Sequence, residues 1–116
     1  MKENILLDKT LDFASNIVLF YEDFSKTKKD TTIVKQLLRS ATSVGANLKE
    51  AIYGNSKADF ISKLHICLKE TSESIYWLKL LHKTNLIDDR ALRLIENAEE
   101  IKRILISSLN TAKKNK

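Results

Sequence analysis

The amino-acid sequence predicts an all-α protein, and three observations support this fold class. The 116 residues include no proline and only two glycines, whereas a sheet-containing chain would need more turn residues. Apolar residues recur three and four positions apart along four successive segments. Short polar stretches separate these segments, so we expect an antiparallel up-down-up-down four-helix bundle. The chain length is typical of one domain, here spanning residues 1–116.

The first predicted helix runs from about Asp8, which is a plausible N-cap, to Phe24. Its expected inward stripe comprises Leu11, Ala14, Ile17, Val18, Tyr21 and Phe24, widened by Phe13 and Phe20. Polar residues at 25–30 interrupt this pattern. We therefore expect a connection to a second helix there.

The second predicted helix has the most regular apolar period. One of Asp30, Thr31 and Thr32 is expected to cap its start. The stripe comprises Val34, Leu37, Leu38, Ala41, Val44, Gly45, Leu48, Ala51 and Ile52. Gly54 follows where a left-handed residue would end the helix.

Ser56 is the predicted N-cap of the third helix, with Asp59 three residues later in a variant of the capping box. Its inner face is expected to comprise Phe60, Leu64, Cys67, Leu68, Thr71, Ile75, Leu78 and His82. A break at residues 84–85 precedes a fourth helix capped by Asp88. That helix carries the stripe Ala91, Leu94, Ile95, Ala98, Ile101, Leu105 and Leu109. The basic tail, residues 111–116, is expected to fray.

The net charge of +5 and the pI near 9.3 favour an acidic partner such as RNA or DNA. The 15 acidic residues are mixed with 20 basic ones, so a surface that is merely solvated is the alternative. No segment approaches the ~20 apolar residues of a membrane span, and the opening residues are too charged for a signal peptide. Cys67 is the only cysteine, which excludes an intrachain disulfide. We expect a cytoplasmic protein that does not contact a membrane.

The sequence lacks the residue patterns that catalysis on a helical bundle requires. Di-iron bundles use Glu-x-x-His, but Ser62 and Lys79 stand three residues before His65 and His82. No glycine-rich phosphate loop is present either. We predict that the protein is not an enzyme, with no catalytic residue, no metal site and no cofactor.

Two helices carry a second face that a monomeric bundle does not need. On the second helix, small and hydrogen-bonding residues oppose the apolar stripe; on the third, Trp77 and two aliphatic residues flank two glutamates. We interpret these faces as a surface for self-association. The predicted interface residues are Arg39, Ser40, Ser43, Asn47, Glu50, Glu70, Glu73 and Trp77. A core wide enough to include Trp77 is the alternative, and Arg39 could pair with any of the three glutamates.

Lysines near the connections and the tail are the candidate contacts to nucleic-acid phosphates. The predicted set comprises Lys26, Lys28, Lys29, Lys35, Lys49, Lys57, Lys113, Lys114 and Lys116. No helix-turn-helix or zinc-finger spacing accompanies them. We therefore expect binding without sequence specificity, with a solvated lysine surface as the alternative.

Residues 36–51 resemble the signature of the 23S rRNA-intervening sequence proteins. The signature consists of an arginine, a serine, small apolar residues, a second serine, and then Asn and Glu on one helix. Its positions here are Arg39, Ser40, Ser43, Asn47 and Glu50. The segment 69–78, which includes Tyr-Trp-Leu, is similar to the glutamate-rich third helix of the family. Ala51 departs from the glycine that often follows the glutamate.

The resemblance implies a four-helix bundle that assembles as a homopentameric ring, with the signature residues at subunit contacts. The chain is also similar to the accessory protein of diversity-generating retroelements, a basic pentamer that binds nucleic acid and a reverse transcriptase. A homo-oligomer that binds RNA or DNA through basic surfaces is therefore the expected function. A scaffold that binds another protein, with no nucleic-acid role, is the alternative.

Overall fold

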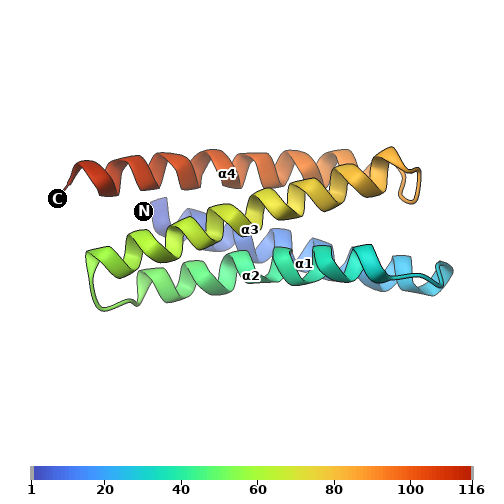
Figure 1. Cartoon of the computed structure of the whole chain (residues 1–116), viewed down its shortest axis with the longest axis horizontal. Coiled ribbons are helices and arrows are strands. Elements are labelled where there is room, and N and C mark those ends of the chain that lie inside the picture. Colours follow the sequence, from blue (N-terminus) through green and yellow to red (C-terminus); the bar gives the residue numbers. More distant parts are fainter. Residues whose placement is uncertain (1, 116) are drawn as a thin grey trace.

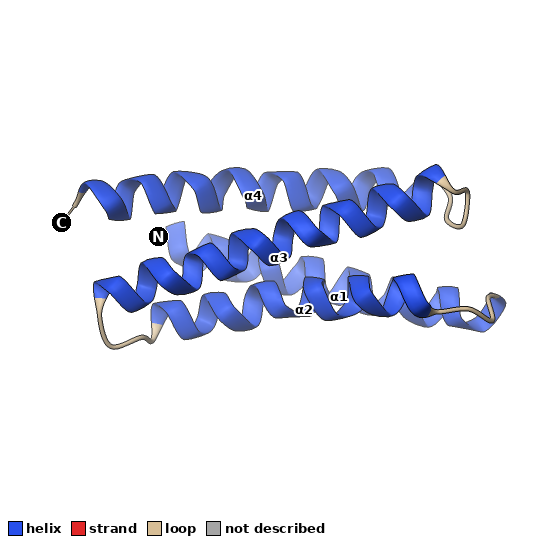
Figure 2. Cartoon of the chain, in the orientation of Figure 1, coloured by secondary structure: helices blue, strands red, loops and turns tan. Residues whose placement is uncertain are grey.

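The structure, a computed structural model, describes residues 2–115, with side chains from Asn4 onward. It contains four helices: α1 (Lys2–Thr27), α2 (Thr32–Ile52), α3 (Lys57–Lys83) and α4 (Arg90–Lys114). Only short connections separate them, and no strand occurs among the described residues (Figure 2). The predicted all-α class with four helices is confirmed.

The chain reverses direction at each connection, so that helices adjacent in sequence lie side by side (Figure 1). α1 also contacts α4, which closes the group into a four-helix arrangement around one core. The molecule is an elongated body of 49 × 20 × 20 Å. The start of α1 and the end of α4 lie at the same end of its long axis (Figure 1).

The prediction for α1 was wrong in its start and in part of its inward face, although the predicted Phe13, Ile17, Phe20 and Phe24 are buried. The helix begins at Lys2 rather than Asp8, because the apolar pattern continues upstream to Leu6, which is 1% exposed. The residues that face the core are Leu6, Thr10, Phe13, Ile17, Phe20 and Phe24. Leu11, expected in the core, is 66% exposed, and Val18 is 41% exposed. The face that carries the phenylalanines is buried because aromatic rings remove the larger apolar area from water.

The predicted inward stripe of α2 is largely confirmed, with Val34, Leu37, Ala41, Val44, Leu48 and Ala51 buried. Before the first turn, the Asp30 carboxylate accepts a 2.9 Å hydrogen bond from the backbone N–H of Thr32. This bond lowers the pKa of Asp30. At Gly45 an added Cβ would stand 3.2 Å from Thr10 Oγ1. Glycine there allows α1 and α2 to approach closely.

The helix ends show which turn residues were assigned correctly. Ser56 caps α3 as predicted, because its hydroxyl accepts a 3.0 Å hydrogen bond from the backbone N–H of Asp59. Gly54 is not left-handed. The left-handed residue is Asn85 (φ 58°), where the Asn85 and Leu86 amides bond to the carbonyls of His82 and Leu81, both at 3.0 Å. This is a Schellman ending, a role that asparagine can fill in place of glycine.

The N-cap position of α4 is Asp89 rather than the predicted Asp88, which tethers the helix start from one residue earlier. The Asp88 carboxylate accepts hydrogen bonds of 3.0 Å from the backbone N–H and from Nε of Arg90. Arg90 also binds the Asp23 carboxylate at 3.0 Å, which fastens this turn to α1. At its other end α4 continues through Lys114, so the tail expected to fray is helical as far as that residue.

None of the four helices, as far as the structure describes them, has the long apolar stretch that crossing a bilayer requires.

Candidate functional site

The seam between α2 and α3 contains a buried hydrogen bond between two serines. Ser40 Oγ lies 2.8 Å from Ser74 Oγ, and both residues are fully enclosed. Each hydroxyl also lies within hydrogen-bonding distance of a carbonyl of its own helix, Ser40 at 3.2 Å from Leu37 and Ser74 at 2.9 Å from Glu70. Because a hydroxyl carries one proton, one serine donates to its helix carbonyl while the other donates to that serine. Small side chains at both positions let the two helix backbones approach while every buried hydroxyl keeps a partner.

Directly beside the serines, Arg39 of α2 binds two carboxylates of α3. Its Nη1 lies 3.1 Å from Glu70 Oε2, and its Nη2 contacts Glu73. The Glu70 side chain is only 7% exposed, whereas the arginine is 52% exposed. Trp77 Nε1 donates to the same Glu73 carboxylate at 3.3 Å. We call the six residues of this continuous polar contact the seam network: Arg39, Ser40, Glu70, Glu73, Ser74 and Trp77.

The seam network corrects part of the predicted interface. Ser40 and Glu70 were assigned to an outward face, but both are buried between α2 and α3 and have no surface to offer another subunit. Arg39 selects Glu70 and Glu73, whereas Glu50 pairs instead with Lys63 at 3.4 Å. The remaining predicted interface residues are exposed or half-buried: Arg39, Ser43, Asn47, Glu50, Glu73 and Trp77.

Ser43 and Asn47 extend the polar face of α2 along the helix. Ser43 donates to the Arg39 carbonyl at 2.7 Å, and Asn47 donates to the Ser43 carbonyl at 2.8 Å. These bonds use the hydroxyl proton of Ser43 and one N–H of the Asn47 side-chain amide within the helix. The amide oxygen of Asn47 and the two carboxylate oxygens of Glu50 still have capacity to accept further hydrogen bonds.

Ser74 is the residue of the seam network that sequence reasoning missed. It lies between Thr71 and Ile75 on the inward side of α3, but a serine at such a position is indistinguishable from a solvated one in the sequence. Its spacing of four residues from Glu70 was the available signal. The partner, Ser40, lies on another helix, so only the structure shows the pairing.

The chemical groups of the seam are engaged in structural bonds. Glu70 and Glu73 both bind a permanent cation, and burial raises the pKa of the nearby Cys67 thiol to about 12. That thiol donates to the Val44 carbonyl at 3.4 Å, so it is protonated and unreactive near neutral pH. Within residues 2–115, no group of three or more His, Cys, Asp or Glu residues is arranged to hold a metal ion.

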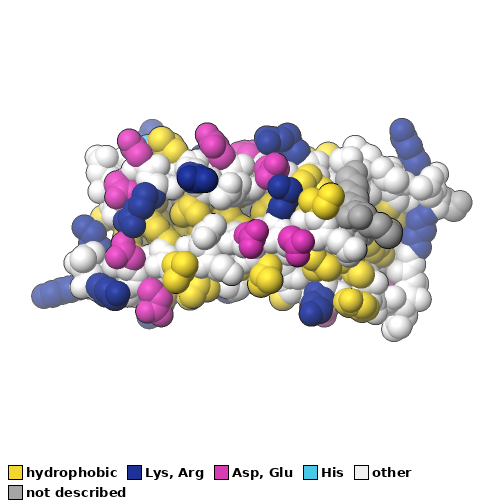
Figure 3. All heavy atoms as spheres, turned by 180° about the vertical axis from the view of Figure 1, so that it is seen from behind, with side chains coloured by type: hydrophobic (Ala, Val, Ile, Leu, Met, Phe, Trp, Pro, Cys, Tyr) yellow, Lys and Arg dark blue, Asp and Glu magenta, His cyan; other side chains and the backbone are white. Residues whose placement is uncertain are grey.

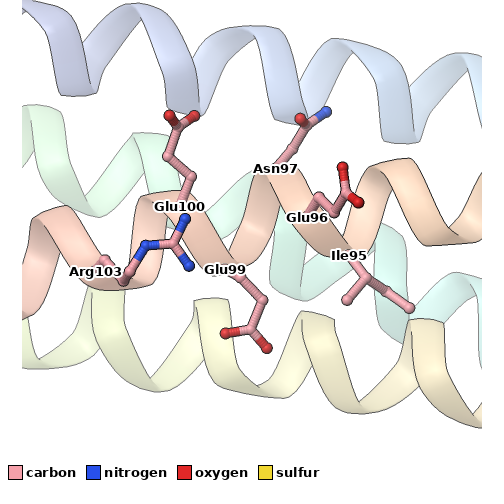
Figure 4. Close-up of a pocket in the computed structure, with 6 residues that line it drawn as sticks. All are labelled: Ile95, Glu96, Asn97, Glu99, Glu100 and Arg103. Atoms are coloured by element: carbon pink, nitrogen blue, oxygen red, sulfur yellow. The ribbon is translucent and has the colours of Figure 1, made fainter.

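A shallow hollow of about 510 Å³ lies over the outer side of α4 (Figure 4). Its lining residues diverge: Glu99 and Ile95 point toward α3, while Asn97 and Glu100 point toward α1 (Figure 4). Glu100 is bound to Lys9 at 3.0 Å. Because no set of polar groups converges on one point, this hollow does not have the geometry of a ligand site.

The structure divides the predicted nucleic-acid contacts between opposite ends of the bundle. Lys26, Lys28, Lys29 and Lys35 lie near the connection of α1 to α2, and Lys49, Lys57, Lys113 and Lys114 lie near the other end. All eight are exposed, and none forms an ion pair within the described chain. Lys116 lies outside the described residues. Several of these lysines stand in the last turn of a helix, where a cation also stabilises the helix dipole.

The fold and the seam together define a class of protein: a small four-helix bundle whose second and third helices are joined by a buried serine pair and an arginine bound to two glutamates. The family model of the 23S rRNA-intervening sequence proteins matches residues 2–107, and the chain belongs to this family.

A solved structure agrees with the assignment. It is a protein of unknown function from the S23 ribosomal protein family of Bacteroides thetaiotaomicron VPI-5482, 43% identical to this chain. The two structures superpose with a TM-score of 0.92, covering 95% of this chain and 99% of the other. No protein of curated function shows a significant match to the chain.

Proposed function

We propose that the protein is a non-catalytic, cytoplasmic homo-oligomer that binds RNA or DNA through its basic surfaces. The observation that carries this proposal is the set of eight exposed lysines without an ion pair in the described chain. The ion-paired cations lie elsewhere, as Lys9, Arg39, Lys63 and Arg90 do. Unpaired lysines can replace the counterions of a nucleic-acid backbone without first losing a protein partner.

Self-association is part of the proposal, and the family resemblance implies five subunits in a ring. The polar face of α2 formed by Ser43, Asn47 and Glu50 supports a specific contact between subunits. A ring would repeat each lysine cluster around its axis. Weak phosphate contacts of single subunits would then add through multivalency.

The test is fluorescence anisotropy of a labelled RNA and a matched DNA, titrated with the full chain at low and near-physiological salt. We expect micromolar or tighter binding at low salt that weakens steeply as salt rises, because each phosphate contact releases counterions. Absence of binding at low salt would refute the nucleic-acid function.

A protein-binding scaffold is the second candidate, and a specific surface favours it. A groove of about 370 Å³ runs between α1 and α2, and most of its lining is apolar. The groove includes Leu11 and Tyr53, which are 66% and 72% exposed. Binding to such a surface would be led by apolar contacts, so it would change little between low and high salt.

A further inference from the structure

The outward side of α3 carries a line of residues that the predicted lysine set did not include. Successive members are four, three, four, three and four positions apart, so they lie along one straight face of the helix. All are exposed except the half-buried serine. We call this line the basic ridge: His65, Lys69, Ser72, Tyr76, Lys79 and Lys83.

The basic ridge contains no acidic residue. The carboxylates of α3 are those of Asp59, near its start, and of Glu70 and Glu73, which Arg39 binds at the seam. Arg39 therefore offsets one of the two negative charges closest to the middle of the ridge. None of the three ridge lysines forms an ion pair within the described chain.

Neighbouring surfaces do not share this uniform charge. On α4, Glu99 points toward α3 (Figure 4), but no ion pair joins it to a ridge lysine. α1, which is nearest to the viewer in Figure 3, carries more acidic than basic residues. Acidic, basic and hydrophobic side chains are mixed on that face (Figure 3). An anionic partner would therefore be attracted to the ridge and not to the α1 face.

Tyr76 adds an aromatic surface at the centre of the ridge. Its side chain is 59% exposed, and its ring packs against Trp77 in an edge arrangement with centroids 5.1 Å apart. Trp77 is itself bonded to Glu73, which Arg39 holds. The seam network thus supports one side of the tyrosine ring while much of the ring stays open to solvent.

We propose that the basic ridge binds an unpaired nucleic-acid strand, with Lys69, Lys79 and Lys83 on the phosphates and a base stacked on Tyr76. This inference rests on the proposed function and assigns it to one surface. The helical rise places Lys69 and Lys83 about 21 Å apart, with the tyrosine between them. Cations that follow the backbone and an aromatic ring that stacks a base are the two elements of single-strand binding. A duplex keeps its bases stacked internally and offers the tyrosine no free base face.

Two triple variants of the full chain locate the binding surface. The ridge variant combines Lys69→Gln, Lys79→Gln and Lys83→Gln. The control combines Lys28→Gln, Lys29→Gln and Lys114→Gln, which removes the same charge from the predicted lysine set at the bundle ends. As the rival binding surface, that set is expected to lose less of the salt dependence than the ridge. The probe is a labelled, unstructured RNA oligonucleotide followed by anisotropy over a range of salt. In a plot of log affinity against log salt, the slope is negative, and we expect its magnitude to be smaller by about two in the ridge variant. Each of the three lost single-strand phosphate contacts contributes about 0.7 to that magnitude.

The possible outcomes separate this inference from the proposed function. A control variant that loses as much of the slope as the ridge variant, or more, would overturn the ridge assignment while leaving nucleic-acid binding intact. A wild-type protein that does not bind the probe at low salt would overturn both.

Tyr76 supplies an independent test that does not depend on charge. We expect Tyr76→Leu to weaken single-strand binding about 5- to 150-fold, the range measured when a stacked aromatic is lost. Tyr76→Phe keeps the ring and should retain the wild-type affinity, and neither variant should change binding of a matched duplex. Equal affinity of wild type and Tyr76→Leu for the single strand, with circular dichroism showing an unchanged helix content, would contradict the stacking role.

Discussion

Replacing Arg39 by alanine should destabilise the bundle, because it leaves a buried carboxylate without its cation. Glu70 loses the Arg39 Nη1 contact of 3.1 Å while its side chain remains only 7% exposed. Glu73 loses the same guanidinium but is 32% exposed, so water can replace much of that interaction. The expected cost therefore arises mainly at Glu70.

The magnitude follows from the exposure of the two partners. Removing one partner of a fully buried ion pair costs about 3–5 kcal/mol. Arg39 is 52% exposed, so solvent already screens part of the attraction, and we expect about 2 kcal/mol. For a domain of this size, that loss lowers Tm by about 6–12 °C. Arg93→Ala is the matched control: Arg93 is an exposed arginine with no ion pair in the described chain, and its loss should change stability by less than about 0.5 kcal/mol.

Urea unfolding followed by circular dichroism measures these differences, at one fixed protein concentration because assembly also contributes to stability. A double-mutant cycle with Glu70→Gln isolates the pair. Once the carboxylate is neutral, losing the arginine should cost less, so the double variant should be more stable than the sum predicts by at least about 0.5 kcal/mol. Additive single effects, or an Arg39→Ala variant as stable as wild type, would refute this account of the seam.

Three further predictions concern the core, a helix start and the cysteine. Phe13→Ala should lose about 3–5 kcal/mol in urea unfolding, whereas Leu11→Ala should lose less than about 1 kcal/mol; equal losses would show that the inward face of α1 is misassigned. The hydrogen bond from the Arg90 backbone N–H lowers the pKa of Asp88 below its ordinary value of 3.8. This bond therefore stabilises the folded protein fully above pH 3.8, and its contribution is lost as the pH falls through the lowered pKa. Calorimetry of Asp88→Ala should therefore show a Tm deficit at neutral pH that closes in acid; a constant deficit would contradict this. Cys67, with a pKa raised to about 12, should react with Ellman's reagent at neutral pH only after unfolding; rapid modification of the folded protein would show that the thiol is accessible.

The helix count and three of the inward faces could be read from apolar spacing, because α2, α3 and α4 each have one dominant stripe. α1 has two, one through Leu11 and Val18 and one through Phe13 and Phe20. Periodicity identifies both stripes but cannot decide which one the other helices cover. Likewise, glycine was a reasonable choice for a left-handed residue, yet Asn85 occupies that conformation and Gly54 does not.

The seam was predictable only in part, because its defining contacts join residues about 30 positions apart. The sequence singled out Arg39, Glu70 and Glu73 but could not choose among the acidic partners. It assigned Ser40 to the outside because the small and hydrogen-bonding residues of the second helix oppose its apolar stripe. The buried position becomes favourable only with the Ser74 hydroxyl 2.8 Å away on another helix.

The measurement that tests the central claim most directly is light scattering of the full chain, alone and with an excess of single-stranded RNA, at low salt. The account predicts a protein mass several times the 13.3 kDa of one chain, five times if the family resemblance holds, and a further increase in mass when RNA binds. A mass of 13.3 kDa that does not change on addition of RNA would contradict both the assembly and the function proposed for it.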